Sequence, residues 1–301
     1  EIEFTGGLRY FEVSDRDHTI ESGIWVGPEA AVLNVEGKNT GTRKKGSISW
    51  RPNDDMSFYG LYSEGYRPGG SNLPTVPHDC VGDVNAQFYK PRYESDEIKN
   101  YEIGTKGAIL DKRVRYSAAV YYIDWTNVQS NIYMDSCGFS FTGNAVSGKS
   151  QGFEIETTSY LTDTLQMTAN FSYTKSEITA DSESINALKG DDMTMVPAYS
   201  AYIALQQEVE FMDRPGFVRV AVSAYDEVKS HFQVKDQDIS PAYAIVDMAA
   251  SIEATDNVTV SFHVNNLLNK EYTTYRNSRS RGDNPRHAQY NYYGAERNIT
   301  L

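Results

Sequence analysis

The feature that most constrains the fold is an alternation of apolar and polar residues that recurs along the chain. Residues 257–265 show it most clearly, because every second residue there is apolar and every residue between is polar. Similar alternation runs through residues 165–174, 217–225 and 242–253. Successive side chains of a strand point to opposite faces, so each segment is predicted to be a strand with one apolar face and one polar, water-exposed face. Helical periodicity is scarce.

The connections between these strands fall into two classes. The pattern predicts about twelve strands, joined alternately by a tight turn and by a long Gly-, Asn- and Asp-rich segment. The short turns lie at residues 52–55, 110–113, 161–164, 212–216 and 254–257. The long segments are residues 14–43, 68–95, 126–147, 178–196, 227–240 and 268–292. In an antiparallel order, the turns gather at one rim and the long loops at the other.

That arrangement favours an outer-membrane barrel, in which short turns lie on one side and long loops on the other. Strands of about ten residues suit a tilted membrane strand. Connections in compact soluble domains are usually about 4–6 residues, which makes six long loops unusual. A soluble all-β sandwich or jelly roll with extended loops is the alternative, because a sandwich also hides one face.

The composition excludes some classes of binding partner and of fold. The chain has 28 Lys and Arg against 41 Asp and Glu, a net charge of −13, which argues against nucleic acid as a partner. No run approaches the ~20 apolar residues of a membrane helix, so a helical membrane protein is excluded. Mean hydropathy is −0.54 and 22 residues are Tyr, which fits strands that are apolar on one face and flanked by aromatic girdles.

Several motifs, in a fixed order, point to one family. The first is Gly-Tyr-Arg-Pro-Gly-Gly-Ser-Asn at 65–72, followed by Tyr-Glu-Ser-Asp at 93–96 and Asn-Tyr-Glu-Ile-Gly-Thr-Lys-Gly at 100–107. Later come residues 118–125, Asn-Ala at 144–145, Ser-Gln-Gly-Phe-Glu at 150–154 and Val-Asn-Asn-Leu-Leu-Asn-Lys-Glu-Tyr at 264–272. Together these resemble the C-terminal half of the barrel of a TonB-dependent outer-membrane receptor.

The resemblance implies an all-β, antiparallel, up-and-down transmembrane β-barrel. Such receptors have 22 strands around a plug domain, and residues 1–301 are expected to be the C-terminal portion, about twelve strands, with the plug absent. The chain starts at Glu1 without Met or a signal segment, and it stops before the family's terminal aromatic. We therefore expect a piece truncated at both ends, which alone would not insert as a stable barrel.

The resemblance further implies transport of a scarce nutrient across the bacterial outer membrane, most often a ferric siderophore, energised through TonB. Implied partners are an iron-chelate ligand, the TonB complex (through a missing N-terminal region), the plug domain, and outer-membrane lipid and lipopolysaccharide. No cofactor is implied. A passive porin-like barrel and a soluble β-rich carbohydrate-binding protein remain alternatives. The sequence specifies neither the substrate nor the oligomeric state.

No catalytic or metal-binding constellation is recognisable. The five His residues are scattered without ligand spacing, and neither a Gly-x-Ser-x-Gly elbow nor a phosphate loop occurs. Acidic residues at 181, 183, 191 and 192 are interpreted as a solvated loop in preference to a cation site. An enzyme is therefore not expected.

Candidate ligand-binding residues lie at the expected extracellular mouth. Arg67 follows a strand, and its guanidinium would suit an anionic chelate, although a salt bridge at the rim is the favoured interpretation. The last long loop carries a basic cluster that would suit an anionic chelate or lipopolysaccharide phosphate, or would simply be solvated. The ligand-binding candidates are Arg67, Asn72, Arg276, Arg279 and Arg281.

Two further sets complete the expectations. Residues on the polar strand faces are expected to line the lumen and contact the plug. They are Arg219, Asp247, Glu253 and His263. Cys80 and Cys137 fall on neighbouring long loops of one rim, where an oxidising exterior permits a disulfide. Two free loop thiols are the alternative.

Overall fold

A computed structural model describes residues 1–24, 27–232, 239–279 and 288–301. Its main element is one antiparallel sheet of twelve strands in the order β1-β2-β3-β6-β7-β8-β9-β10-β11-β14-β15-β18. The predicted all-β class and number of strands are confirmed. The first six of these strands are β1 (Ile2–Gly23), β2 (Gly27–Asn53), β3 (Met56–Arg67), β6 (Asp96–Ile109), β7 (Val114–Met134) and β8 (Phe139–Tyr160). The others are β9 (Leu165–Ile178), β10 (Tyr199–Phe211), β11 (Arg214–Tyr225), β14 (Tyr243–Thr255), β15 (Val258–Asn265) and β18 (Asn298–Thr300).

Short elements occupy the long connections. Three small antiparallel pairs are β4 (Gly70–Ser71) with β5 (Arg92–Tyr93), β12 (Val228–Lys229) with β13 (Ile239–Ser240), and β16 (Thr273–Arg279) with β17 (Ala288–Tyr293). Three 3₁₀ turns are η1 (His78–Cys80), η2 (Val84–Phe88) and η3 (Glu183–Ile185). The described residues contain no helix that is long and apolar enough to cross a membrane.

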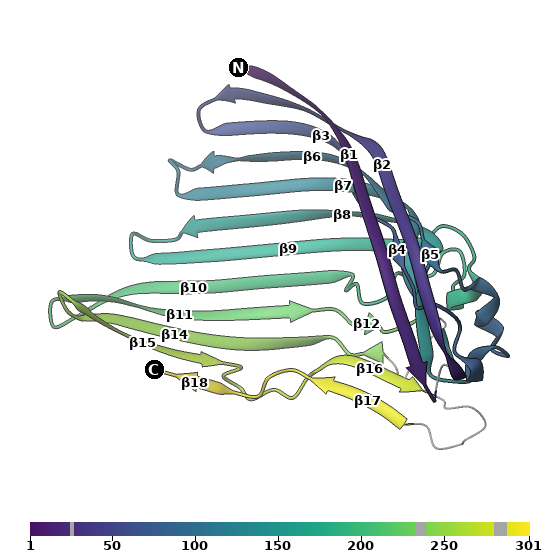
Figure 1. The fold of residues 1–301 in the computed structure, drawn as a ribbon. Coiled ribbons are helices and arrows are strands. Elements are labelled where there is room, and N and C mark those ends of the chain that lie inside the picture. Colours follow the sequence, from purple (N-terminus) through teal and green to yellow (C-terminus); the bar gives the residue numbers. More distant parts are fainter. Residues whose placement is uncertain (25–26, 233–238, 280–287) are drawn as a thin grey trace.

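The two classes of connection lie at opposite ends of the sheet, as Figure 1 shows. Tight turns such as β6–β7 and β10–β11 project at the left of that view, while η1, η2 and β16–β17 lie at the right. The sheet curves, so that β1 and β2 cross the view at a steep angle to β7–β11. At the β10–β11 turn Met212 and Asp213 have φ of 53° and 58°, the left-handed geometry of a two-residue hairpin turn.

Two segments expected to be loops are strands, so those expectations were wrong. Residues 14–43 belong almost entirely to β1 and β2, which are 22 and 27 residues long. Residues 126–147 belong mostly to β7 and β8, whose ladder continues to Met134 opposite Phe139. Much of these outer halves has no consistently apolar face, so the alternation that marks a membrane strand is weak there. Ladder hydrogen bonds pair the strands all the same.

The two faces of the sheet differ in chemistry. One face carries exposed apolar side chains at the middle of the strands, and we call it the apolar face. Examples are Ile103, Val120, Ile155, Ile203 and Val222. Aromatic rings follow one another across strands on this face, with ring centroids 5.1 Å apart for both Tyr62–Tyr101 and Tyr173–Tyr199. The opposite face is polar, which is the distribution of a barrel wall between lipid and an aqueous lumen.

Two clusters of buried apolar side chains lie beyond the sheet's middle, at its loop end. One cluster contains Cys80, Ile132, Met134 and Phe141, and Met134 is 1% exposed. A second contains Val128, Val146, Ile178 and Ala187. Ala145 and Ile185 pack against both clusters. The long connections are therefore a packed cap with its own core.

Candidate functional site

The 68–95 connection is fastened to the β7–β8 hairpin by hydrogen bonds to backbone. The Asn72 side chain donates to the carbonyl of Thr142 at 2.8 Å and accepts from the Thr142 N–H at 2.9 Å. Asn85 donates to the carbonyl of Tyr133 at 2.7 Å. Asn72, a candidate ligand residue, has its amide occupied by these contacts and by the Lys90 carbonyl. Its position indicates a structural role.

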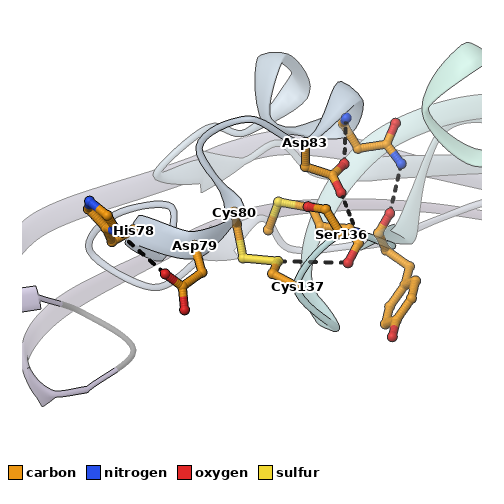
Figure 2. Close-up of a disulfide and its surroundings, with 9 residues drawn as sticks. His78, Asp79, Cys80, Asp83, Ser136 and Cys137 are labelled. Carbon is orange, nitrogen blue, oxygen red and sulfur yellow. Dashed lines mark hydrogen bonds and ion pairs between the residues drawn. A yellow bond between two sulfur atoms is a disulfide. The ribbon is translucent and has the colours of Figure 1, made fainter. Parts of the chain in front are cut away.

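A disulfide joins the same two elements. Cys80, in η1, is bonded to Cys137, which lies between β7 and β8 (Figure 2). Cys80 is 1% exposed and belongs to the first apolar cluster. The two cysteines singled out in the sequence are thus bridged, and the bridge lies inside a hydrophobic core.

Asp83 supports this bridge. Its carboxylate accepts hydrogen bonds from the backbone N–H of Asn85 at 2.8 Å and of Ser136 at 2.9 Å (Figure 2). Burial acts to raise the pKa of Asp83, but these N–H donors outweigh it and hold the pKa below its usual range. Asp83 therefore stays ionised at neutral pH and links η2 to the residue beside Cys137.

Arg67 pairs with a buried acid. It lies opposite Asp96 in the β3–β6 ladder, where Asp96 is 0% exposed. The guanidinium Nε donates to Asp96 Oδ2 at 2.7 Å and the backbone N–H of Arg67 donates to Oδ1 at 3.0 Å. Burial acts to raise the pKa of Asp96, yet the Arg67 hydrogen bonds lower it below the usual range. The pair lies beyond the apolar band, at the loop end of both strands.

One face of the planar Arg67 guanidinium covers an aromatic ring. Arg67 Cζ lies 5.1 Å from the centroid of Trp125, within cation–π range. Its Nη2 also donates to the carbonyl of Gln129 at 3.3 Å. Arg67 therefore joins β3, β6 and β7 at the rim, which corresponds to the salt-bridge interpretation made from the sequence.

Asn144 forms a second set of side-chain hydrogen bonds to backbone at the loop end, and the sequence pattern did not predict this role. Its Oδ1 accepts from the Glu94 N–H at 2.7 Å, and its Nδ2 donates to the carbonyls of Glu94 at 2.9 Å and Asn127 at 2.8 Å. Asn127 has a φ of 58° at an irregularity of the β7–β8 ladder. Asn144 was visible only as part of a motif, since its partners are 50 and 17 residues away.

A cavity of about 810 Å³ lies among these fastened connections. Apolar walls come from β7, β8 and β9, through Val128, Val146 and Ile178. Rings come from Trp125, Tyr133, His231, Phe232 and Tyr275. Asp135 and Glu183 are the acids among the described lining residues, and none of those residues is Lys or Arg. This is the size and mixed chemistry of a small-molecule site.

The polar face of the sheet carries a group of charged and hydrogen-bonded side chains. Tyr59 donates to Glu102 Oε1 at 2.7 Å, and Glu154 and Glu156 line the same hollow of about 410 Å³. Arg219 donates to the Tyr202 hydroxyl at 2.6 Å on this face. The ladders put Asp247, Glu253 and His263 on the same side, opposite the apolar side chains. All four predicted lumen residues therefore share the polar face.

The basic cluster of the last long connection is only partly described. Arg276 lies on β16, and its Nε is buried without a hydrogen-bond partner among the described residues. For Arg279 the backbone ends β16, while its side chain lies outside the described part. Arg281 lies outside the described residues altogether. Arg276 is not among the described residues that line the cavity.

Comparisons with known proteins agree on one family. The family model described as TonB dependent receptor-like, beta-barrel matches residues 2–267. The pesticin receptor of Yersinia enterocolitica is 27% identical over 278 residues, which cover 91% of this chain and 38% of the receptor. The ferrichrome outer membrane transporter/phage receptor of Escherichia coli K12 is 27% identical over 261 residues, covering 82% of this chain and 31% of the transporter.

The fold has the same relatives. The crystal structure of the ferric yersiniabactin uptake receptor from Yersinia pestis superposes with a TM-score of 0.73 at 21% identity, covering 99% of this chain and 42% of that one. At this identity the likeness concerns the fold. The chain spans well under half the length of the relatives it matches.

Proposed function

Because this chain belongs to the TonB-dependent receptor β-barrel family, we propose that it contributes wall and ligand site to an importer of a scarce nutrient. The nutrient is a ferric siderophore, and the energy reaches the receptor through the TonB complex. The observation that carries this proposal is the cavity of about 810 Å³ among the long connections of a family barrel sheet. Related proteins named as ferrichrome transporter and pesticin receptor support a ligand-capturing role.

The sheet's two faces support location in the bacterial outer membrane. Exposed apolar side chains such as Ile103 (67% exposed) and Val120 (55% exposed) meet the lipid, and the aromatic rows lie where the strands leave it. The tight turns then face the periplasm. The long connections face the exterior, an oxidising medium in which the Cys80–Cys137 disulfide is stable.

The polar face fits a plug as its partner. Glu102 and Glu154 come from neighbouring hairpins and share one hollow with Glu156. Three carboxylates in one hollow favour a basic partner surface, because like charges brought together otherwise repel. Near the periplasmic end a further hollow of about 620 Å³ is lined by charges of both signs, among them Lys106, Arg115 and Asp55. In this proposal residues 1–301 are the C-terminal portion of the barrel, and the plug comes from another part of the receptor.

Transport, not catalysis, is the proposed activity. The matched family consists of receptors and transporters, and the site offers a chelate a cavity wall of rings, carboxylates and amides. The siderophore is captured at the loop end, and the TonB complex drives its release inward. A passive porin-like barrel requires no such energy, and a soluble carbohydrate-binding protein requires no apolar outer face.

The test is iron uptake by the full-length receptor in an outer-membrane-bearing strain that lacks its own siderophore receptors. We expect saturable uptake of radioactive iron that stops when TonB is deleted. Uptake that persists without TonB would identify a passive pore, and recovery in the soluble fraction would favour the soluble alternative. Ser130→Trp, which fills the cavity, should lower uptake about tenfold, since a ligand site is sensitive to lost volume, whereas Ser130→Ala should not.

A further inference from the structure

Trp125 connects the rim of the sheet to the cavity. It lies on β7, opposite Ile98 of β6 in one ladder and Gly148 of β8 in the next, and its ring is part of the wall of the cavity of about 810 Å³. The second apolar cluster packs against it. A side chain on a paired strand is held more precisely than one on a loop. Trp125 therefore offers the cavity a ring that is fixed by the scaffold.

Arg67 supports this ring from behind. Its Cζ lies 5.1 Å from the ring centroid of Trp125, and the guanidinium is itself held by Asp96 and by the carbonyl of Gln129. Trp125 lines the cavity, whereas Arg67 is not among the described residues that do so. The guanidinium thus covers ring surface that lies outside the cavity wall and leaves the remaining ring surface toward the cavity.

The wall beside Trp125 is built around the same ring. Gly148 lies opposite Trp125, and a Cβ at Gly148 would overlap the Cε of Met193. The missing side chain therefore leaves room for Met193, which also lines the cavity. Trp125 and Met193 both pack against the second apolar cluster. Indole and thioether together form one apolar wall.

The indole N–H indicates that stability alone does not explain a tryptophan here. Nε1 of Trp125 is buried and has no hydrogen-bond partner among the described residues. A buried donor without a partner carries a desolvation cost, which a phenylalanine ring at the same place would avoid. What tryptophan adds is ring area, and part of that area faces the cavity.

We infer that Trp125 is the ring against which the captured ligand packs, and that Arg67 is a positioning residue that holds this ring without binding the ligand itself. This inference rests on the proposed function and adds the wall residue that makes the contact. An indole face fits a planar ligand group in an offset stack, such as a chelating hydroxamate or a catechol ring. Because Nε1 is buried, the contact is made by the ring surface and not by the N–H.

Three variants and a control separate the two roles. Trp125→Leu removes the ring and Trp125→Phe keeps a smaller one, and neither breaks a hydrogen bond of the side chain within the described structure. Arg67→Lys keeps a positive charge beside Asp96 but lacks the planar guanidinium that covers the ring. Trp50→Leu is the matched control, because Trp50 lies on β2 beside the β2–β3 turn, is 50% exposed and stacks on Phe58.

The experiment measures equilibrium binding of two probes, a ferric tris-hydroxamate and a ferric tris-catecholate, to the detergent-solubilised full-length receptor. For the probe that the unaltered receptor binds more tightly, we expect Trp125→Leu to weaken binding about thirtyfold, the size of an interface hot spot. Trp125→Phe and Arg67→Lys should each weaken it about threefold, a typical size for a partly retained ring contact. Adding Arg67→Lys to Trp125→Leu should cause no further loss, because both act through one contact. Trp50→Leu should change nothing.

Indole fluorescence supplies a readout that a merely structural role would not change. A bound ferric chelate quenches a tryptophan that it contacts, so Trp125→Phe should remove more of the ligand-induced quenching than Trp50→Phe does. Full affinity in Trp125→Leu would overturn the ligand contact and leave siderophore import standing. A further loss on adding Arg67→Lys to Trp125→Leu would show that Arg67 binds the ligand directly. If the correctly folded, unaltered receptor binds neither probe, the proposed siderophore function fails together with the inference.

Discussion

The buried carboxylate of Asp96 is held by both the backbone N–H and the guanidinium of Arg67, which lies 29 residues earlier in the chain. Asp96 is fully buried, whereas the Arg67 side chain is 49% exposed. The two partners therefore depend on each other unequally. Water can solvate a lone Arg67, but a lone Asp96 would be a charge buried without its counter-ion.

This asymmetry predicts that Arg67→Ala destabilises the loop end more than Asp96→Ala does. Breaking a buried pair costs about 3–5 kcal/mol when the remaining charge stays buried, and about 2–3 kcal/mol is reasonable here because backbone N–H donors remain. Hydrogen exchange of residues 68–95 in the full receptor measures the difference. Equal effects of the two variants would show that Asp96 gains little from the guanidinium.

The Cys80–Cys137 bridge predicts a local loss of stability on reduction. Closing a chain across 57 residues contributes about 4 kcal/mol at most in the loop-entropy treatment. Because β6 and β7 already hold this chain, we expect the loss to appear as faster exchange in η1 and η2 and not as loss of the sheet. Cys80→Ala with Cys137→Ala is the suitable variant, since serine would bury a hydroxyl in an apolar cluster.

A control separates the contribution of the disulfide bond to stability from the contribution of side-chain packing. Reducing the unaltered protein keeps both sulfur atoms in the cluster, whereas the double alanine variant removes them. If reduction alone leaves exchange in residues 78–88 unchanged, the bridge contributes nothing beyond the packing of Cys80 against Met134 and Phe141.

The sequence predicts those features of the fold that depend on local pattern, and it does not predict those that depend on contacts between residues far apart in the chain. Alternation in residues 165–174 and 217–225 identifies strand faces locally, because the period of two is a property of one strand. It correctly places Arg219 on the polar face and Val220 on the apolar one. The tight turns follow for the same reason, since a hairpin turn is local.

The cap was not predictable in this way. Ile132, Met134 and Phe141 lie in a segment whose composition predicts a long loop, and they form a core with η1, some 50 residues away. Likewise, the role of Arg67 depends on the register that puts it opposite Asp96. The cap core and the Arg67–Asp96 pair both depend on contacts between residues far apart in the chain, which no local sequence pattern indicates.

The Asp15–Arg92 pair predicts a pH-dependent attachment of the β1–β2 hairpin to the cap. Arg92 donates to both carboxylate oxygens of Asp15, at 2.6 and 3.0 Å, and this hydrogen bonding holds the pKa of Asp15 below its ordinary value of 3.8. A lowered pKa in the folded state means that the stabilisation is fully present above that ordinary value. It is lost as the pH falls through the lower, folded-state pKa.

We therefore expect proteolysis within residues 12–40 to increase below about pH 4, and to be raised already at neutral pH in Asp15→Asn. Gly37 offers a second variant, because it lies opposite Asp15 in the ladder and a Cβ there would meet the Arg92 guanidinium. Gly37→Ala should displace Arg92 and open the hairpin at neutral pH. Cleavage that is independent of pH in the unaltered protein would contradict the role of this pair.

The two faces of β7 predict different losses of stability when lysine replaces neighbouring residues at the same depth in the membrane. Val120 is 55% exposed on the apolar face, and its neighbour Ala119 lies opposite Glu154 on the polar face. Val120→Lys places an ammonium in lipid, which costs about 2–4 kcal/mol near the middle of the bilayer. Ala119→Lys places it beside carboxylates, so a much smaller loss is expected. The measurement is the urea midpoint of the full receptor refolded into lipid vesicles. Equal losses would mean that Val120 does not face lipid, which would reverse the assignment of the two faces.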